Sequence, residues 1–95
     1  MLNSWEREGW LSRFAALVQI FAESSDVESI ENALSKLDNL EAFFEVTGEF
    51  DIVALVSAAD NVEFREILRN KIRSIEGVKG IVSSVVLRDS RAPMR

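Results

Sequence analysis

Hydrophobic and polar positions follow two different spacings along the first half of the chain. Residues 13–22 are rich in Val, Ile, Phe and Leu without helical spacing, and a polar run ends them, which predicts a strand and then a turn. The next apolar residues are three or four positions apart, which places one apolar stripe on a helix. They are Val27, Ile30, Leu34 and Leu37. Ser25 or Asp26 can cap this helix, which is expected to end near Asp38.

The second half of the chain predicts two strands, a helix and a final strand. Residues 40–46 and 50–58 are largely apolar runs on either side of Gly48, which can take a positive φ in a hairpin turn at no steric cost. A cap at 59–61 precedes a helical stripe that ends at Gly77, a common residue at helix C-termini. The stripe consists of Phe64, Ile67, Leu68, Ile72 and Ile75. Residues 78–87 form the last predicted strand.

An internal repeat supports the order β-α-β-β-α-β. A shift of 38 residues, which brings position 16 onto position 54, superimposes Ala16-Leu17-Val18 on Ala54-Leu55-Val56 and aligns apolar residues through the next helix and strand. Connection rules fold this order into a four-stranded antiparallel sheet with both helices on one face. We therefore predict a ferredoxin-like α+β domain over residues 13–88, with an N-terminal extension (1–12) and a C-terminal tail (89–95).

Both faces of the predicted sheet are apolar. Because strand residues alternate between faces, the first strand places Ala16 and Val18 on one side and Leu17 and Gln19 on the other. Two helices cover only one face, and an uncovered apolar face is typical of a contact surface. We expect a homodimer that pairs through the face holding Gln19 and Ser57. The alternative is a monomer whose tails cover the sheet, which the polar residues 89–95 disfavour.

Composition excludes several classes of function. Sixteen acidic against eleven basic residues give a net charge of −5, which opposes the phosphate neutralisation that nucleic-acid binding requires. The absence of Cys and His removes thiolate nucleophiles, the usual zinc sites and imidazole acid–base chemistry, so no cofactor or metal is expected. No apolar run approaches the roughly 20 residues that span a bilayer, and the N-terminus has no secretory signal. The cytoplasm is therefore the expected compartment.

Two motifs carry a resemblance to a known family. The run Val46-Thr47-Gly48-Glu49-Phe50-Asp51-Ile52-Val53 is followed, after Leu68 and Ile72, by Ser74-Ile75-Glu76-Gly77-Val78. Together they resemble the regulation-of-amino-acid-metabolism domain of the Lrp/AsnC transcription regulators, which has a Val-Thr-Gly-x-Tyr/Phe-Asp turn and an Ile-x-Gly-Val step before its last strand. The resemblance covers roughly residues 13 to 88.

The resemblance implies binding of an amino-acid effector, dimerisation through the sheets and assembly of dimers into octameric rings, with effectors between adjacent dimers. It also implies full-length Lrp/AsnC-type regulators as partners. Carried over by position, the effector site would consist of Thr47, Gly48, Phe50 and Asp51 from one chain and Ser83 from a neighbour.

The sequence departs from the family in two respects. Only twelve residues precede Arg13, where full-length members have a helix-turn-helix domain, so we expect a stand-alone form. Ile81 occupies a last-strand position that is often Thr in the family, so the effector is expected to be more apolar or the site to be lost.

Each site residue also has a structural interpretation. The Asp51 carboxylate can pair with the ammonium group of an amino acid while backbone N–H groups around Gly48 bind its carboxylate, or it can simply stabilise the turn. Phe50 can line the pocket or pack across the strands, and Ser83 can contact the ligand or be an ordinary strand hydroxyl. Trp5 and Trp10 are expected to dock on a partner chain or on the helices.

Other charged groups are interpreted as structural. Glu41 and Glu45 are expected to share a strand face but to lie too far apart for paired acid–base chemistry. The basic residues of the second helix are expected to form its solvated side, balanced by Glu63 and Glu66. They are Arg65, Arg69, Lys71 and Arg73.

Three functions remain open at this point. The first is a non-catalytic, ligand-responsive module that modulates Lrp/AsnC-type regulators or amino-acid metabolism. The second is a small enzyme of the dimeric α+β barrel type, such as a cofactor-free monooxygenase; the lack of His argues against haem ligation in such an enzyme. The third is a purely structural oligomerisation module.

Overall fold

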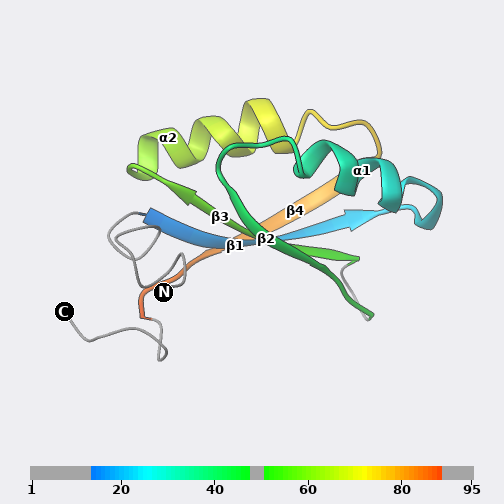
Figure 1. Cartoon of the computed structure of the whole chain (residues 1–95), viewed down its shortest axis with the longest axis horizontal. Helices are drawn as coiled ribbons and strands as arrows, with labels where there is room; N and C mark the ends of the chain where they lie inside the picture. The colour runs from blue at the N-terminus through cyan, green and yellow to red at the C-terminus, as the bar shows by residue number, and fades with distance from the viewer. Residues whose placement is uncertain (1–13, 48–50, 89–95) are drawn as a thin grey trace, which may run out of the picture.

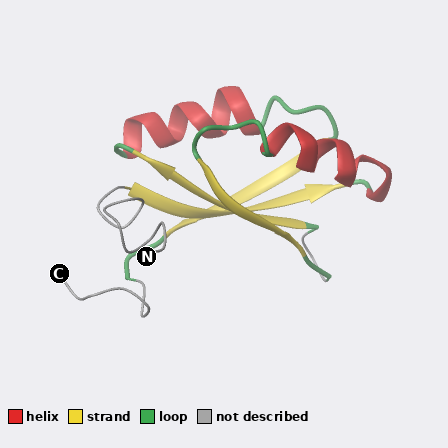
Figure 2. Cartoon of the chain, in the orientation of Figure 1, coloured by secondary structure: helices red, strands yellow, loops and turns green. Residues whose placement is uncertain are grey.

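The computed structural model describes residues 14–47 and 51–88. Within these ranges a four-stranded antiparallel sheet has the strand order β2-β3-β1-β4 and carries the helices on one side (Figures 1 and 2). The strands are β1 (Phe14–Ala22), β2 (Leu40–Glu45), β3 (Ile52–Ala58) and β4 (Val78–Val85). The helices are α1 (Val27–Leu34), after a 3₁₀ turn at Ser24–Asp26, and α2 (Asn61–Glu66), which continues as a π-helix at Ile67–Ile72. The predicted ferredoxin-like β-α-β-β-α-β fold is confirmed.

The two copies of the predicted repeat pair with each other in the two central strands, β1 and β3. In the antiparallel register of β1 and β3, Ala16 faces Val56, Leu17 faces Leu55 and Val18 faces Ala54. The two copies of the Ala-Leu-Val triplet therefore pair with each other, related by a local twofold axis. The helix positions that the repeat aligned, Leu34 and Ile72, are both fully buried.

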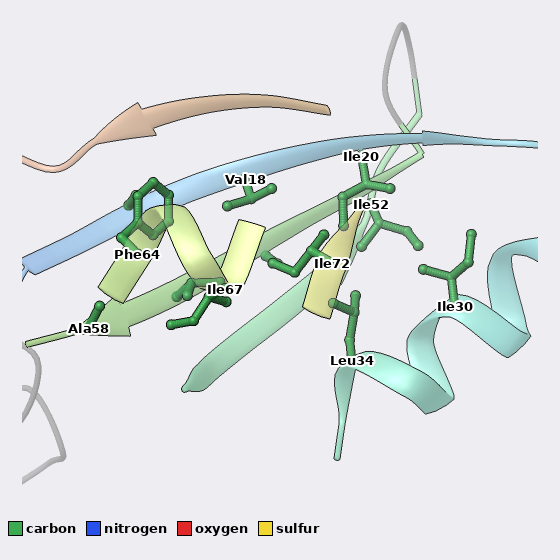
Figure 3. Packing of buried hydrophobic residues seen from close by; sticks show 12 residues of the cluster. Val18, Ile20, Ile30, Leu34, Ile52, Ala58, Phe64, Ile67 and Ile72 are labelled. Atoms are coloured by element: carbon green, nitrogen blue, oxygen red, sulfur yellow. The ribbon is translucent and has the colours of Figure 1, made fainter. Parts of the chain in front are cut away.

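The core lies between the sheet and the two helices. Alternate residues of the central strands, among them Val18, Ile20 and Ile52, face the helices and are completely buried. Ile30 and Leu34 of α1 and Phe64 of α2 close over them, as Figure 3 shows. Phe64 also packs against Phe14, with ring centroids 5.2 Å apart. These side chains provide the apolar burial that stabilises the fold.

The opposite face of the sheet, which we call the open face, has no helix over it in the described part of the chain (Figure 1). The pairing register assigns to it Ala15, Leu17, Gln19 and Phe21 of β1, Val53, Leu55 and Ser57 of β3, Ala42 and Phe44 of β2, and Val82 and Ser84 of β4. Leu17 is 39% exposed, Val82 46% and Phe44 58%. The face with Gln19 and Ser57 is thus the one that the helices leave uncovered, as predicted.

The second helix differs from the uniform α-helix that the apolar stripe predicted. The backbone N–H of Arg73 donates to the carbonyl of Leu68, five residues earlier, at 2.8 Å. In a π-helix residues five apart share a face, whereas in an α-helix they point to different sides. Ile67 and Ile72 are both buried against the sheet because the backbone adopts the wider turn. Leu68, which the stripe included, is only half-buried.

The helix caps agree with the sequence for α2 and only in part for α1. Asp60 accepts a hydrogen bond from the Glu63 backbone N–H at 2.9 Å, and the Glu63 carboxylate accepts one at 2.6 Å from the N–H of Ala59, so this pair resembles a capping box shifted by one residue. Asp26 lies at the N-cap of α1, but its side chain forms no capping hydrogen bond.

The first helix and the last strand are shorter than predicted. The first helix ends at Leu34 rather than near Asp38, because two successive turns lead the chain directly into β2. In these turns the Leu37 N–H donates to the Leu34 carbonyl and the Leu40 N–H to the Leu37 carbonyl. Strand β4 ends at Val85, two residues before the predicted limit.

Candidate functional site

The candidate site is centred on Asp51, at the end of the hairpin that joins β2 to β3. The Val46 N–H donates to the Asp51 carbonyl at 3.1 Å, which closes the predicted hairpin, and the Asp51 N–H donates to the Ile20 carbonyl at 3.1 Å. One oxygen of the Asp51 carboxylate accepts a hydrogen bond of 2.9 Å from the backbone N–H of Ala22. The side chain therefore ties the start of β3 to the end of β1, as the turn-stabilising interpretation requires, while the acid remains half-buried and near the surface.

Two charged residues that the sequence analysis did not single out lie at the same end of the sheet. The Lys79 ammonium group forms an ion pair with the Glu23 carboxylate at 2.5 Å. Its pKa is raised, first by the hydrogen bond and charge of Glu23 and to a smaller extent by the negative charge of Asp51. Glu23, Asp51 and Lys79, from three separate segments, thus form a mixed-charge group, which we call the hairpin-end cluster.

A β-bulge explains why Lys79 belongs to this cluster. Phe21 pairs with Gly80 and Ala22 with Val78, so Lys79 is the extra residue in β4. A bulge bends its strand and redirects the extra side chain. Simple alternation along β4 gives no signal for this position, and only the pairing register reveals it.

The other predicted site residues are not brought together within one chain. Thr47 is exposed next to the hairpin turn, and Gly48 and Phe50 lie outside the described residues. Ser83 is exposed in β4 and pairs with Val18, four residues from the end of β1 that Asp51 contacts. At the rise of a strand this is a separation of roughly 13 Å along the sheet. The prediction that Ser83 serves a neighbouring chain's site thus stays a prediction.

Ile81 has a structural role that accounts for its apolar side chain. It pairs with Ile20 on the helix-covered face and packs against the core. A hydroxyl at this position would be partly withdrawn from water, so the isoleucine adds to the stability of β4.

Glu41 and Glu45 do not share a face of β2, contrary to the prediction. The pairing of β2 with β3 is irregular between Leu40 and Ala42, and this irregularity reverses the alternation. Glu41 accepts a hydrogen bond of 2.7 Å from the buried Ser57 hydroxyl on the open-face side, whereas Glu45 faces Glu31 of α1 on the other side. The two carboxylates therefore belong to separate interactions.

The carboxyl groups of Glu31 and Glu45 form an acidic contact between α1 and β2. Burial, followed by a hydrogen bond with Glu45 and the charges of Glu45 and Glu28, raises the pKa of Glu31 above its ordinary value of 4.5. One Glu31 oxygen, Oε2, is buried without a hydrogen-bond partner. Two carboxyl groups in contact are stable together when they share a proton.

We expect the Glu31→Gln variant to be more stable than the wild type at neutral pH. The stability that the Glu31 proton supplies is complete below pH 4.5 and is lost as the pH rises through the raised pKa, because the folded chain then releases the proton that the contact needs. An amide can donate to Glu45 at any pH. Thermal unfolding from pH 4 to 8 should show a midpoint higher by roughly 2–5 °C for the variant at pH 7.5 and a smaller decline with pH.

The matched control for this variant is Glu66→Gln, which removes a carboxylate from the exposed side of α2. It should leave the pH dependence of the midpoint unchanged. A Glu31→Gln midpoint that follows the wild-type pH curve would show that the acidic contact does not influence stability.

The strand order, the single layer of helices and the hairpin with its acidic end define a ferredoxin-like α+β domain. The chain belongs to the Lrp/AsnC family, because the family model described as the Lrp/AsnC ligand binding domain matches residues 15–93. This finding confirms the family that the hairpin and Gly-Val motifs predicted.

Curated relatives contain this domain in two settings. The chain is 28% identical over 98 aligned positions to an HTH-type transcriptional regulator of Pyrococcus abyssi, PYRAB01370, covering 90% of this chain and 62% of the regulator. It is 31% identical over 74 positions to a homocitrate synthase of Sulfurisphaera tokodaii, covering 77% of this chain but 16% of the enzyme. The chain thus spans less than two thirds of the length of each relative.

Solved structures agree with the fold. TTHA0845 from Thermus thermophilus superimposes with a TM-score of 0.75 at 29% identity, covering 80% of this chain and 95% of that one. The transcriptional regulator NMB0573 from Neisseria meningitidis, solved as a complex with L-Met, superimposes with a TM-score of 0.78 at 19% identity, covering 95% of this chain and 58% of the regulator.

Two further observations concern the described residues. None of their helices is long and apolar enough to cross a membrane. They also contain no group of three or more Asp or Glu side chains placed to hold a metal ion.

Proposed function

We propose that this protein is a non-catalytic module that binds an amino acid and oligomerises, and that it modulates Lrp/AsnC-type transcription regulators. The observation that carries the proposal is the match of residues 15–93 to the family's ligand-binding domain. The L-Met complex of NMB0573, which shares the fold, supports an amino acid as the effector class. A regulator of this kind acts in the cytoplasm, which we propose as the compartment.

The hairpin-end cluster has the charges that an amino-acid zwitterion requires. The Asp51 and Glu23 carboxylates can accept from an α-ammonium group, and the Lys79 ammonium can pair with an α-carboxylate. Glu23 and Lys79 are exposed and form an ion pair with each other. A bound amino acid would break this weak ion pair and form one bond with each of the two side chains. In the assembly that we propose, Ser83 of an adjacent chain completes the site.

The proposed assembly is a homodimer through the open face, with dimers joined into larger rings and, in the cell, with full-length regulators of the same family. The exposed apolar residues Leu17, Val82 and Phe44 support pairing through this face. The similarity to part of homocitrate synthase supports a second candidate partner, an enzyme of amino-acid metabolism whose activity the bound effector would adjust.

A thermal-shift screen over the twenty amino acids tests the ligand proposal. Since a ligand that binds only the folded state stabilises it by about 2.7 kcal/mol at a hundred times its dissociation constant, a selective rise of the midpoint is expected for one amino acid or a few similar ones. No selective shift would instead support a purely structural module. Turnover of a substrate by the purified protein would support an enzyme of the dimeric α+β barrel type.

We expect Asp51→Asn to abolish this ligand-induced shift. Asparagine retains an oxygen that can accept from the Ala22 N–H, so the turn persists, but it lacks the charge that attracts an ammonium group. The control is Asp38→Asn, an exposed acid in the turn before β2, which should bind as the wild type does. Retention of the full shift in Asp51→Asn would remove Asp51 from the site and leave it a turn residue.

A further inference from the structure

A hollow of about 270 Å³ lies along the second helix, away from the hairpin-end cluster. It is lined by Arg65, Leu68, Arg69 and Arg73. The three arginines are exposed, and Leu68 is half-buried between them and the core. Three positive charges therefore converge on one concavity of a chain whose net charge is −5.

In the part of the chain that the structure describes, the arginines do not form the ion pairs with Glu63 and Glu66 that the sequence predicts. Within the described residues, the ion pair that forms is Lys79 with Glu23, and none of the three guanidinium groups takes part in one. The Glu63 carboxylate accepts from the Ala59 backbone N–H in the cap of α2. Like charges that converge without counter-charges repel one another, and a bound anion relieves that repulsion.

The three arginines are four residues apart in the sequence and share one side of the second helix. In a regular α-helix, residues four apart drift by about 40° at each step, so three of them spread over about 80° of that side. The wider turn at Ile67–Ile72 counteracts this drift between Arg65, Arg69 and Arg73 while it keeps Ile67 and Ile72 in the core. Single π-turns inside helices occur frequently at functional sites.

We propose that this groove binds a small polyanion with two or three linked phosphate groups, such as pyrophosphate or the phosphate chain of a nucleotide. Neighbouring arginines of the groove, four residues apart in the sequence, are at most about 6 Å apart along the helix axis, so they suit several adjacent anionic groups better than a single one. Each guanidinium presents a planar fork that binds phosphate oxygens through two hydrogen bonds. The site is independent of the proposed amino-acid site.

Size and charge favour a small ligand over a macromolecule. A volume of 270 Å³ lies just below the usual range of small-molecule sites, which begins at about 300 Å³. A nucleic acid would extend beyond the groove over a surface that is acidic overall, where its phosphates would be repelled. The groove could instead contact an acidic protein surface, such as that of a second copy of this chain. The experiment distinguishes this case from binding of a small anion.

Isothermal titration of the 95-residue chain at constant ionic strength and without Mg²⁺ tests the proposal. The ligands are inorganic pyrophosphate, ATP and orthophosphate. Saturable binding of pyrophosphate is expected, about ten-fold tighter than that of orthophosphate, since two groups contact more than one arginine. Equal affinities for pyrophosphate and ATP would indicate the phosphate chain alone, whereas tighter binding of ATP would indicate a nucleotide; both results support the proposal.

Arg69→Gln is expected to weaken pyrophosphate binding at least ten-fold, because Arg69 lies between the other two arginines. Lys71→Gln removes the same charge from an exposed position on the same helix outside the groove and should change the affinity less than two-fold. Both residues are exposed, so unchanged unfolding midpoints should confirm that the fold persists. The amino-acid shift should persist in Arg69→Gln, which separates failure here from failure of the proposed function.

Three results would overturn the proposal. The first is the absence of saturable heat with both pyrophosphate and ATP. The second is an equal loss of affinity in Lys71→Gln, which would reflect general attraction to a basic helix. The third is a change in the oligomeric state of Arg69→Gln without any anion binding, which would make the groove a contact with another chain's acidic surface.

Discussion

Replacing Leu17 with aspartate is expected to break the proposed dimer into single chains. Leu17 lies near the middle of the open face, opposite Leu55 in the neighbouring strand, and 39% of it is exposed in the isolated chain. In a sheet-to-sheet dimer both copies of this residue would be buried. A carboxylate there must lose its hydration without gaining a partner, and the twofold symmetry introduces two such charges.

The expected effect is large because the twofold symmetry buries two copies of the introduced carboxylate in one interface. At about 1–3 kcal/mol for each of the two unpaired groups, the dimer should weaken by roughly 30-fold to 20,000-fold. Sedimentation velocity or light scattering at micromolar concentration measures it directly. The fold should persist, because the Leu17 side chain is outside the helix-covered core.

Val62→Asp is the matched control for this change. It removes an apolar side chain of similar kind from α2, where 70% of the residue is exposed, and introduces the same charge. This variant should assemble as the wild type does. If the wild type itself sediments as a folded single chain, or if Leu17→Asp leaves the assembly intact, the open face is not the dimer interface.

Local patterns predicted the sheet because each of them has one physical interpretation. Strand geometry alone places the side chains of Leu17 and Gln19 on one face and that of Val18 on the other. The helices pack against the more apolar of the two faces, which becomes the core. The hairpin is equally local, because Gly48 and the Val46–Asp51 hydrogen bond belong to one short stretch. Such features do not depend on distant parts of the chain.

Features that depend on two segments could not be predicted in this way. The separation of five between Ile67 and Ile72 was visible in the sequence, but it indicates a π-helix only when both residues must face the same sheet. Lys79 joins the hairpin-end cluster through a bulge that β1 imposes on β4. The sequence could therefore suggest Asp51 as a candidate, but it could not show that Lys79 lies near it.

The Gly77→Ala variant should be among the least stable single substitutions in this domain. Gly77 has a φ of 98°, a conformation that L side chains rarely adopt, and it is the last residue of the turn between the π-helix and β4, directly before Val78. A Cβ atom placed there would lie 2.7 Å from the Cβ of Asp26, at the start of α1. This close approach gives a physical reason for the glycine in the Ile-x-Gly-Val step.

The two penalties are additive to a first approximation. The left-handed backbone costs about 1–2 kcal/mol for a residue with a Cβ, and relief of the contact requires a shift that costs about 1–3 kcal/mol. A loss of about 2–5 kcal/mol corresponds to a midpoint lower by roughly 8–40 °C in a domain of this size. Gly80→Ala is the control, because its Cβ would meet only the Phe21 ring at an ordinary 3.7 Å.

A second substitution separates the two penalties. The atoms nearest to the added Cβ, at 2.7, 2.9 and 3.1 Å, all belong to the Asp26 side chain, so Asp26→Gly removes the contact without altering the backbone strain at position 77. In a double-mutant cycle, Gly77→Ala should therefore cost less in the Asp26→Gly background, by about 1–3 kcal/mol. Equal costs in both backgrounds would assign the whole effect to φ. A Gly77→Ala protein as stable as Gly80→Ala would mean that the close approach of Gly77 to Asp26 is absent in solution.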